Sequence, residues 1–540
     1  MRVLRQFTSR FTMLSTAAFF ALSSPGLAAE GDLQFPAFAQ AVAEAAIGQD
    51  EVAAFYRSNG YEPIWTSDDA ASMARRTALL RALGSAGDHG LPVAQYDTSA
   101  VEAQMRHVAS PREQGQVEAE LSRIFLTYAH QLQTGILNPR DVSRDMKRRP
   151  QRVDGTELLS GLAASDNPDF YIRGLVPDSD EYAQLMHARF ELEELVNEGG
   201  WGPTVQASKL SPGDSGPAVI ALRNRLVAMG YLNRSATMTY DADIQKAVQR
   251  FQSDSGLTSD GVAGDSTLDA LNISARDRLK SVIVAMERER WLSIDRSQRY
   301  IWVNQTDFTA RIIDAGAITF ETRSVVGQNN SDRRTPEFSD VMEHLIVNPT
   351  WNVPRSIATN EYLPNMIQSQ GQTARHLQLV DGRGNVVSRE SIDWEAVTPA
   401  NFPFDLKQPP SRGNALGLVK FMFPNPYNIY LHDTPSKSLF ARETRTFSHG
   451  CVRLGDPFDF AYALLAEQED DPVSFFQSIL RTGRETQVDL VNPVPVHLVY
   501  RTAFSNLRGE MSYRRDMYGR DAMVWSALQA AGVTLPGGES

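Results

Sequence analysis

Cysteine is almost absent from this sequence: among 540 residues, only Cys451 carries a thiol. A single cysteine cannot form an intramolecular disulfide. The chain also lacks the paired cysteines of structural zinc sites, the alternating ligands of calcium loops and the glycine-rich motifs that hold nucleotide phosphates. Any chemistry therefore falls to the side chains alone, and we expect neither a metal nor another cofactor.

An excess of positive charge is missing as well. The formal net charge is −12 at pH 7, which argues against nucleic acid as a partner, because binding it would call for a basic face. With 42% hydrophobic and 22% charged residues, the composition is that of an ordinary globular protein with ample core material. A length of 540 residues allows about three domains.

Long hydrophobic runs do not occur either. One short apolar run, residues 11–22, follows three arginines and precedes the small residues Gly26 and Ala28. The run is too short to span a bilayer comfortably, and this order of features predicts a secretory leader at residues 1–28. We therefore expect an exported, periplasmic protein that has no stable membrane segment after the leader is removed.

The surroundings of Cys451 point to a nucleophile. A lone cysteine is most often a small buried hydrophobe, but His449 and Arg453 lie two positions before and after this one. Each can favour the thiolate, which is the reactive form of cysteine. Gly450 permits a tight backbone approach, so successive N–H groups can converge on one oxygen as an oxyanion hole.

A second histidine, His432, lies nineteen positions before the cysteine. The residues just before it favour a strand, and residues 433–435 stop that strand. If residues 448–454 form the neighbouring strand, His432 can sit beside the thiol and act as its base. A backbone carbonyl near Asp433 could then orient the imidazole ring.

These residues match a known pattern. Ser-His-Gly-Cys-x-Arg, preceded by a histidine about twenty positions upstream, resembles the L,D-transpeptidase catalytic domain of the YkuD type. Residues 348–354 and 414–425 are similar to the large periplasmic members of the YcbB type. Residues 516–521 also resemble the family, but they suggest no chemical role.

The resemblance implies a two-step acyl transfer. Cys451 attacks the bond between an L-centre and a D-centre in a peptidoglycan tetrapeptide stem, and His432 takes and returns protons. The N–H groups of Gly450 and Cys451 hold the oxyanion. The terminal D-residue leaves, and the side-chain amine of diaminopimelate in a second stem resolves the thioester to give a 3→3 crosslink.

The remaining site residues receive supporting roles. We expect His449 on the inner wall of the site, bonded to the base or the thiolate. We expect Arg453 to pair with a substrate carboxylate or to brace the loop. Further substrate contacts are expected from Ser448, Trp351, Asn352, Tyr430 and Asp433.

The expected fold class is multidomain α+β. Residues 29–209 show helical spacing and predict a scaffold domain, and residues 210–272 resemble a three-helix peptidoglycan-binding domain. A linker helix is expected within residues 273–296. Residues 297–500 change to a period of two and predict a mostly-β catalytic domain, in which residues 359–412 leave the strand pattern and become polar. The resemblance implies that this insertion forms a mobile lid. Residues 501–540 form a C-terminal extension.

Several alternatives are left open by the sequence. Water in place of the amine would make a carboxypeptidase or endopeptidase, and a lysine on an envelope protein would make a ligase. An inert site would leave a non-catalytic scaffold that binds the wall. His432, His449 and Cys451 could be zinc ligands, but a structural site needs a fourth. Besides tetrapeptide stems, envelope proteins and other wall-synthesis enzymes stay open as partners.

Overall fold

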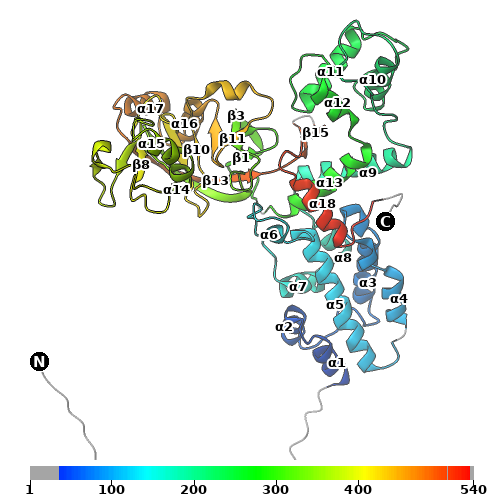
Figure 1. Cartoon of the computed structure of the whole chain (residues 1–540). Coiled ribbons are helices and arrows are strands. Elements are labelled where there is room, and N and C mark those ends of the chain that lie inside the picture. Colours follow the sequence, from blue (N-terminus) through cyan, green and yellow to red (C-terminus); the bar gives the residue numbers. More distant parts are fainter. Residues whose placement is uncertain (1–35, 107, 293, 507–508, 536–540) are drawn as a thin grey trace, which may run out of the picture.

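The computed structural model describes residues 36–106, 108–292, 294–506 and 509–535. The leader predicted at residues 1–28 lies outside these ranges. Figure 1 shows a helical N-terminal part, a small three-helix part and a mostly-β part, which meet around helices α13 and α18. The prediction of a multidomain α+β fold is confirmed. Within the described ranges, no helix combines the length and the apolar character that crossing a bilayer requires.

The N-terminal part is built around the long helix α5. Ser110 caps this helix by accepting the Glu113 N–H, and Pro111 occupies its first turn, both of which favour a helix start. Glu118, fully buried on α5, accepts the Tyr56 hydroxyl and so fixes α2. The helices are α1 Ala37–Ala45, α2 Asp50–Ser58, α3 Ala70–Gly84, α4 Thr98–Arg106, α5 Pro111–Thr134, α6 Pro139–Val142, α7 Gly155–Ala164, α8 Pro168–Arg173 and α9 Asp180–Asn197.

The predicted three-helix unit follows. It consists of α10 Pro217–Ala228, α11 Ala242–Asp254 and α12 Asp265–Asn272. Its core comes from the apolar helical faces seen in the sequence, including Leu222 and Val248. The unit therefore has a hydrophobic core of its own, as expected for a separately folded module.

The linker helix and the C-terminal extension share one core with the scaffold. Helix α13 Ala275–Arg290 packs against α9. The chain returns after the catalytic domain as the hairpin β14 Ala503–Ser505 and β15 Met511–Tyr513, followed by α18 Arg520–Ala530. Leu279, Val524 and Leu528 lie in the same cluster. The C-terminal extension thus ties the catalytic domain back to the scaffold (Figure 1).

The catalytic domain is a nine-stranded sheet in the order β11-β3-β12-β10-β9-β4-β13-β1-β2, and β2 also pairs with β3. This last pairing closes the sheet into a barrel, whose interior is filled by apolar side chains. Helices α16 Pro457–Leu465 and α17 Pro472–Leu480 accompany it. The strands are β1 Tyr300–Asn304, β2 Thr309–Asp314, β3 Ala317–Gly327, β4 Phe338–Val347, β9 Val419–Met422, β10 Leu431–His432, β11 Thr446–Ser448, β12 Val452–Leu454 and β13 Thr486–Val499.

The insertion differs from its sequence prediction. Instead of a polar, strand-poor stretch, it is a packed unit with a core that extends from Trp351 to Leu416. Its sheet has the order β5-β8-β6-β7. The pattern was missed because its strands are only two to four residues long. Its elements are β5 Trp351–Asn352, α14 Arg355–Ile357, a π-helical turn Ala358–Tyr362, α15 Leu363–Gln368, β6 Gln378–Val380, β7 Val386–Val387 and β8 Asp405–Gln408.

Candidate active site

A cavity of about 700 Å³ lies between the cysteine motif and the insertion. Cys451, His432 and Arg453 line it on the barrel side. Trp351 and Asn352, on β5, line it from the insertion. Eight of the ten residues predicted for the site border this cavity: Cys451, His432, His449, Arg453, Ser448, Trp351, Asn352 and Tyr430.

The cysteine lies in a gap between two strands. The sequence allowed residues 448–454 to form one strand, but β11 ends at Ser448 and β12 begins at Val452. Strand β11 is parallel to β3, whereas β12 is antiparallel to it. The reversal occurs at Gly450, whose φ of 116° is unfavourable for other residues. Cys451 is thereby presented from a tight loop rather than from a strand face.

His432 occupies the neighbouring strand, as predicted. Strand β10 pairs in parallel with β12 and aligns His432 with Arg453. The Nδ1 atom of His432 lies 2.5 Å from the Asp433 carbonyl oxygen. Because a carbonyl can only accept, Nδ1 carries the proton and Nε2 is the basic nitrogen. The predicted orienting carbonyl is thus confirmed.

Burial keeps both partners uncharged at neutral pH. It lowers the pKa of His432 to about 3, and the positive charge of Arg453 acts in the same direction. It also raises the pKa of the half-buried Cys451 thiol to about 11, although hydrogen bonds from Tyr430 and the charge of Arg453 oppose this rise. The expected resting thiolate is therefore not supported. The pair is a neutral thiol beside a neutral imidazole, so the proton must move during attack.

Tyr430 is more closely involved with the thiol than a substrate contact would be. Its backbone and hydroxyl groups both hydrogen-bond the Cys451 side chain and lower the pKa of the thiol. Its ring meets the His432 ring edge-on, with 5.6 Å between centroids. The Cys451 Sγ also lies 3.5 Å from the Asn428 carbonyl oxygen. Tyr430 therefore packs against both the nucleophile and the base.

Two predicted roles in the motif need correction. The Ser448 hydroxyl donates to the Cys451 carbonyl at 2.5 Å and accepts the Gly450 N–H at 3.1 Å. The Ser448 hydroxyl thus braces the loop, and it already accepts the Gly450 N–H that was predicted to hold the oxyanion. Within the described part of the chain, the Cys451 N–H has no protein acceptor. No competing bond to a described residue therefore occupies this N–H.

His449 also lies differently from its prediction. Its Nε2 lies 2.7 Å from Oε1 of Glu361, in the π-helical turn of the insertion, and does not bond the thiol or the base. Arg333 donates to the same oxygen at 2.7 Å. Glu361 and Arg333 were missed by the sequence analysis because no local pattern joins residues so far apart along the chain.

Arg453 and Asp433, the two remaining charged residues predicted for the site, differ in whether they have partners within the protein. Arg453 makes no ion pair among the described residues, and its buried Nε lacks a hydrogen-bond partner there. Asp433 does not border the cavity: its carboxylate accepts the Leu418 N–H at 2.9 Å and the Lys437 ammonium at 2.8 Å. These contacts give the Asp433 carboxylate a structural role, and its contact with substrate stays a prediction. Arg453 stays the candidate for an anionic group.

A metal ion finds little to hold it in this arrangement. His432 and His449 each use one nitrogen for a protein acceptor. Across residues 36–535, apart from the few that the structure does not describe, no three His, Cys, Asp or Glu side chains are grouped as metal ligands. The chemistry that this geometry supports is nucleophilic attack by Cys451 with His432 as base.

Comparison with known protein families finds a match for the barrel. Residues 298–480 match the family of L,D-transpeptidase catalytic domains called YkuD. This is an L,D-transpeptidase catalytic domain. Two further matches place other parts of the chain: residues 215–271 match a peptidoglycan-binding domain family, and residues 50–188 match a scaffold domain family. Both lie inside the regions where the sequence predicted such modules.

A curated relative is similar over part of its length. It is a Haemophilus influenzae protein described as an L,D-transpeptidase, and it is 32% identical over 242 residues. The match covers 45% of this chain and 48% of the relative. The chain therefore matches about half the length of this relative.

Two solved structures of L,D-transpeptidases were also found. Those from Xylanimonas cellulosilytica and Stackebrandtia nassauensis are each 14% identical and cover 55% of this chain. The alignments cover 98% and 97% of those chains, with TM-scores of 0.15 and 0.21. Scores this low do not support an argument about the fold.

Proposed function

We propose that this protein is an L,D-transpeptidase that forms 3→3 crosslinks in peptidoglycan through a thioester on Cys451. The observation that carries the proposal is the placement of Cys451. Cys451 lies in the loop that contains Gly450 and lines the cavity. This loop leads into β12, which pairs with the strand β10 that carries His432. The Nδ1 atom of His432 is fixed by the Asp433 carbonyl. This arrangement supplies a nucleophile and an oriented base without a cofactor.

The first step acylates the enzyme. As the Cys451 sulfur attacks the stem carbonyl, its proton passes to Nε2 of His432, and the carbon–sulfur bond forms. The tetrahedral intermediate then breaks its carbon–nitrogen bond. His432 returns the proton to the departing amine of the terminal D-residue. Because the pKa of His432 is lowered to about 3, its ring is neutral at neutral pH and the lone pair on Nε2 is free.

The second step transfers the acyl group. An amine from a second stem attacks the thioester carbonyl, and His432 takes a proton from it. The carbon–sulfur bond breaks, and the Cys451 thiolate that leaves recovers the proton from His432, which restores the resting pair. The Cys451 N–H is the loop donor available to the oxyanion in both steps. Arg453, without an ion pair among the described residues, is suited to a carboxylate of a stem peptide.

The other modules fit work on the cell wall. We assign residues 29–209 to the scaffold, residues 210–272 to holding the glycan or its peptides, and residues 297–500 to catalysis. The substrate lies outside the cytoplasm, so this function requires export, in line with the leader predicted at residues 1–28. Within this division, the insertion covers the cavity while the acyl-enzyme waits for its acceptor.

Product analysis from purified sacculi tests this function. Sacculi rich in tetrapeptide stems are incubated with the intact protein and with Cys451→Ser, and the digested products are analysed by mass. We expect 3→3 crosslinked dimers with the intact protein and none with Cys451→Ser. Trimmed stems alone would identify a carboxypeptidase, wall-linked proteins would identify a ligase, and no change would indicate a wall-binding scaffold. Each of these three results would overturn the proposed crosslinking.

A further inference from the structure

A threonine outside the motif holds the backbone of the catalytic loop. The hydroxyl of Thr335, in the loop between β3 and β4, donates to the Gly450 carbonyl at 2.7 Å. The hydroxyl oxygen of Thr335 also accepts the Gly327 N–H at 2.9 Å. Thr335 is completely buried, so this hydroxyl is fixed on both its donor and its acceptor side.

The bond to Gly450 determines where the Cys451 N–H points. The carbonyl of Gly450 and the N–H of Cys451 belong to one planar peptide group, and in a trans peptide they point in opposite directions. Gly450 has a φ of 116° and is free to adopt many conformations. Without an anchor, this peptide plane could rotate. Thr335 anchors the carbonyl side and so aims the N–H side.

The Thr335 loop is held in turn by three separate parts of the chain. Arg520 donates to the Thr335 carbonyl at 2.8 Å. Gln305, after β1, donates to the Pro336 carbonyl at 3.1 Å. The backbone of Glu337 bonds the scaffold on both sides, donating to the residue 145 carbonyl and accepting from the residue 147 N–H, each at 2.8 Å. Three successive residues are therefore fixed by the C-terminal extension, the barrel and the scaffold.

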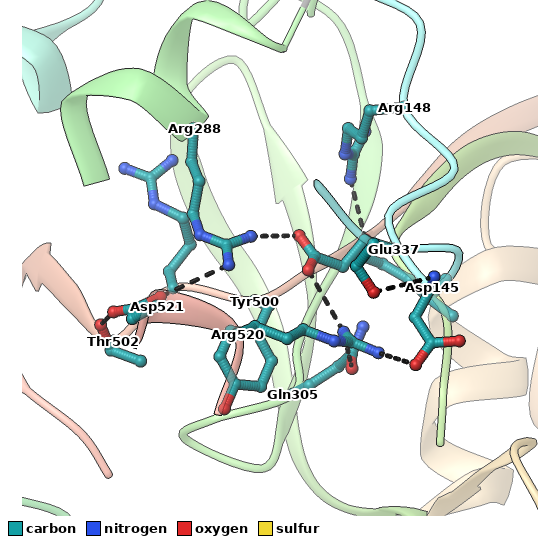
Figure 2. Close-up of polar contacts among 12 residues, drawn as sticks. Asp145, Arg148, Arg288, Gln305, Glu337, Tyr500, Thr502, Arg520 and Asp521 are labelled. Atoms are coloured by element: carbon teal, nitrogen blue, oxygen red, sulfur yellow. Dashed lines mark hydrogen bonds and ion pairs between the residues drawn. The ribbon is translucent and has the colours of Figure 1, made fainter. Parts of the chain in front are cut away.

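Arg520 is the centre of this arrangement. It starts helix α18 and is completely buried. Its guanidinium reaches Gln305 at 3.1 Å and Glu337 at 3.2 Å, and Glu337 also accepts from Arg288 at 2.6 Å. Figure 2 shows Arg520 and Arg288 converging on the Glu337 carboxylate from different segments. Arg520 can hold the Thr335 carbonyl because its own position is fixed by these contacts.

The neighbouring Tyr518 supports the other partner of Thr335. Its hydroxyl donates to the Gly327 carbonyl, and its ring stacks under Arg520 with 4.8 Å from the guanidinium carbon to the ring centroid. Gly327 in turn gives its N–H to Thr335. The C-terminal extension therefore holds both Thr335 and the residue that fixes the Thr335 hydroxyl. Residues 516–521, which resembled the family without a role, thus contact the loop behind the catalytic site.

We propose that Thr335 is a positioning residue for acyl transfer: its hydroxyl aims the Cys451 N–H at the developing oxyanion, and Arg520 holds Thr335 for this purpose. This inference rests on the proposed function. If Thr335 acts in this way, replacing it slows a reaction that forms an oxyanion and leaves unchanged a reaction that forms none. A residue with a general structural role would affect both reactions. Acylation by a carbapenem builds an oxyanion, whereas alkylation by iodoacetamide at a saturated carbon builds none.

The experiment compares these two reactions at the same sulfur. Acylation and alkylation rates of Cys451 are followed by intact-protein mass for the wild type, Thr335→Val and Thr335→Ser. Loss of a whole oxyanion donor lowers kcat about 10²- to 10³-fold, and a misaimed donor should cost less. We expect Thr335→Val to be acylated about 10- to 100-fold more slowly. The maximal acylation rate should fall, while the carbapenem concentration at half-saturation should change little. Thr335→Ser, which keeps the hydroxyl, should restore most of the rate.

Alkylation is the internal control, since it should change less than about twofold in both variants if the thiol itself is undisturbed. Equal acylation in Thr335→Val and the wild type would overturn the inference. Parallel losses in acylation and alkylation would also overturn it, because they would indicate a disturbed thiol. A wild type that is not acylated at all would overturn the proposed function, and the inference with it. Acylation without sacculus crosslinking would overturn crosslinking alone.

A second variant tests the same inference if Thr335→Val does not fold, as judged by circular dichroism and thermal unfolding. Arg520→Lys keeps the positive charge but cannot reach Thr335, Gln305 and Glu337 together. We expect acylation to slow about 3- to 10-fold, a part of the loss of one donor, with alkylation unchanged. An Arg520→Lys protein that folds and acylates at the wild-type rate would show that α18 does not position the loop.

Discussion

His449 of the cysteine motif and Glu361 of the insertion are joined by a hydrogen bond, with 2.7 Å between Nε2 and Oε1. Arg333, in the loop between β3 and β4, donates to the same carboxylate oxygen. All three side chains are partly exposed, so each contact is of modest strength. Such a contact can hold the insertion over the cavity and still release it for substrate exchange.

Glu361→Gln should weaken the closed position of the insertion. We expect sacculus crosslinking to fall several-fold, because water then competes with the acceptor amine for the thioester. Iodoacetamide labelling of Cys451 should stay the same or rise. Glu395→Gln, on the exposed surface of the same insertion, is the matched control. If crosslinking is the same in both variants, the contact does not hold the insertion closed.

A carbapenem should acylate Cys451. Its strained lactam carbonyl presents the same type of electrophile to the sulfur as the stem peptide does. We expect the mass of the intact protein to rise by one drug mass, with the adduct on the peptide that contains Cys451. The wild type without an adduct, or Cys451→Ser with an equal one, would contradict this expectation.

The two histidines should differ in which reaction they affect. His432→Ala removes the base, so acylation should fall about 10²- to 10⁴-fold, while the thiol pKa changes little because no charge on His432 stabilises the thiolate. Burial has already raised the pKa of the Cys451 thiol to about 11. His449→Ala should act like Glu361→Gln. A larger acylation loss in His449→Ala would exchange the two roles.

The acid side of the pH profile should reflect the buried base. Burial lowers the pKa of His432 to about 3, so the ring stays neutral and basic well below its usual value of about 6.5. Acylation should therefore be nearly independent of pH between about 6.5 and 5, and should decline only as the pH approaches the folded pKa. A rate that halves near pH 6.5 would show that the base titrates normally.

The same shift affects stability, with a sign that can be checked. Since the folded pKa of His432 lies below its unfolded value, the unfolded state binds the proton more tightly. Its contribution to stability is present above about pH 6.5 and is lost as the pH falls toward about 3. His432→Gln should therefore reduce the loss of thermal stability on acidification between these values, as measured by unfolding at several pH values.

Arg453 should matter for binding as well as for the thiol. Its positive charge lowers the pKa of Cys451, so Arg453→Gln should raise that pKa and slow iodoacetamide labelling at a given pH. If the guanidinium also binds a stem carboxylate, half-saturation for a tetrapeptide should rise about tenfold, the usual scale for one charged hydrogen bond. Arg383→Gln, exposed on the insertion, is the control. Unchanged half-saturation would leave Arg453 with an electrostatic role alone.

The fold could be predicted from the sequence where its signals are local. Helices of the scaffold and of the three-helix unit follow from apolar spacing, caps and glycine stops, and the mostly-β character of residues 297–500 follows from alternation. Cys451 and His432 were found because the motif and its upstream histidine are short patterns. The insertion was misjudged because its two- to four-residue strands carry too little alternation to be recognised.

The sequence by itself predicted the nucleophile, the base and the modules, because these predictions depend on neighbours along the chain. Only the tertiary structure decided which backbone groups of the catalytic loop are already bonded, since Ser448 accepts the Gly450 N–H and Thr335 donates to the Gly450 carbonyl. It also decided that His449 meets Glu361, 88 positions away. The physical reason is that hydrogen bonds and burial depend on distance in space, and no periodicity records which distant segments will enclose a side chain.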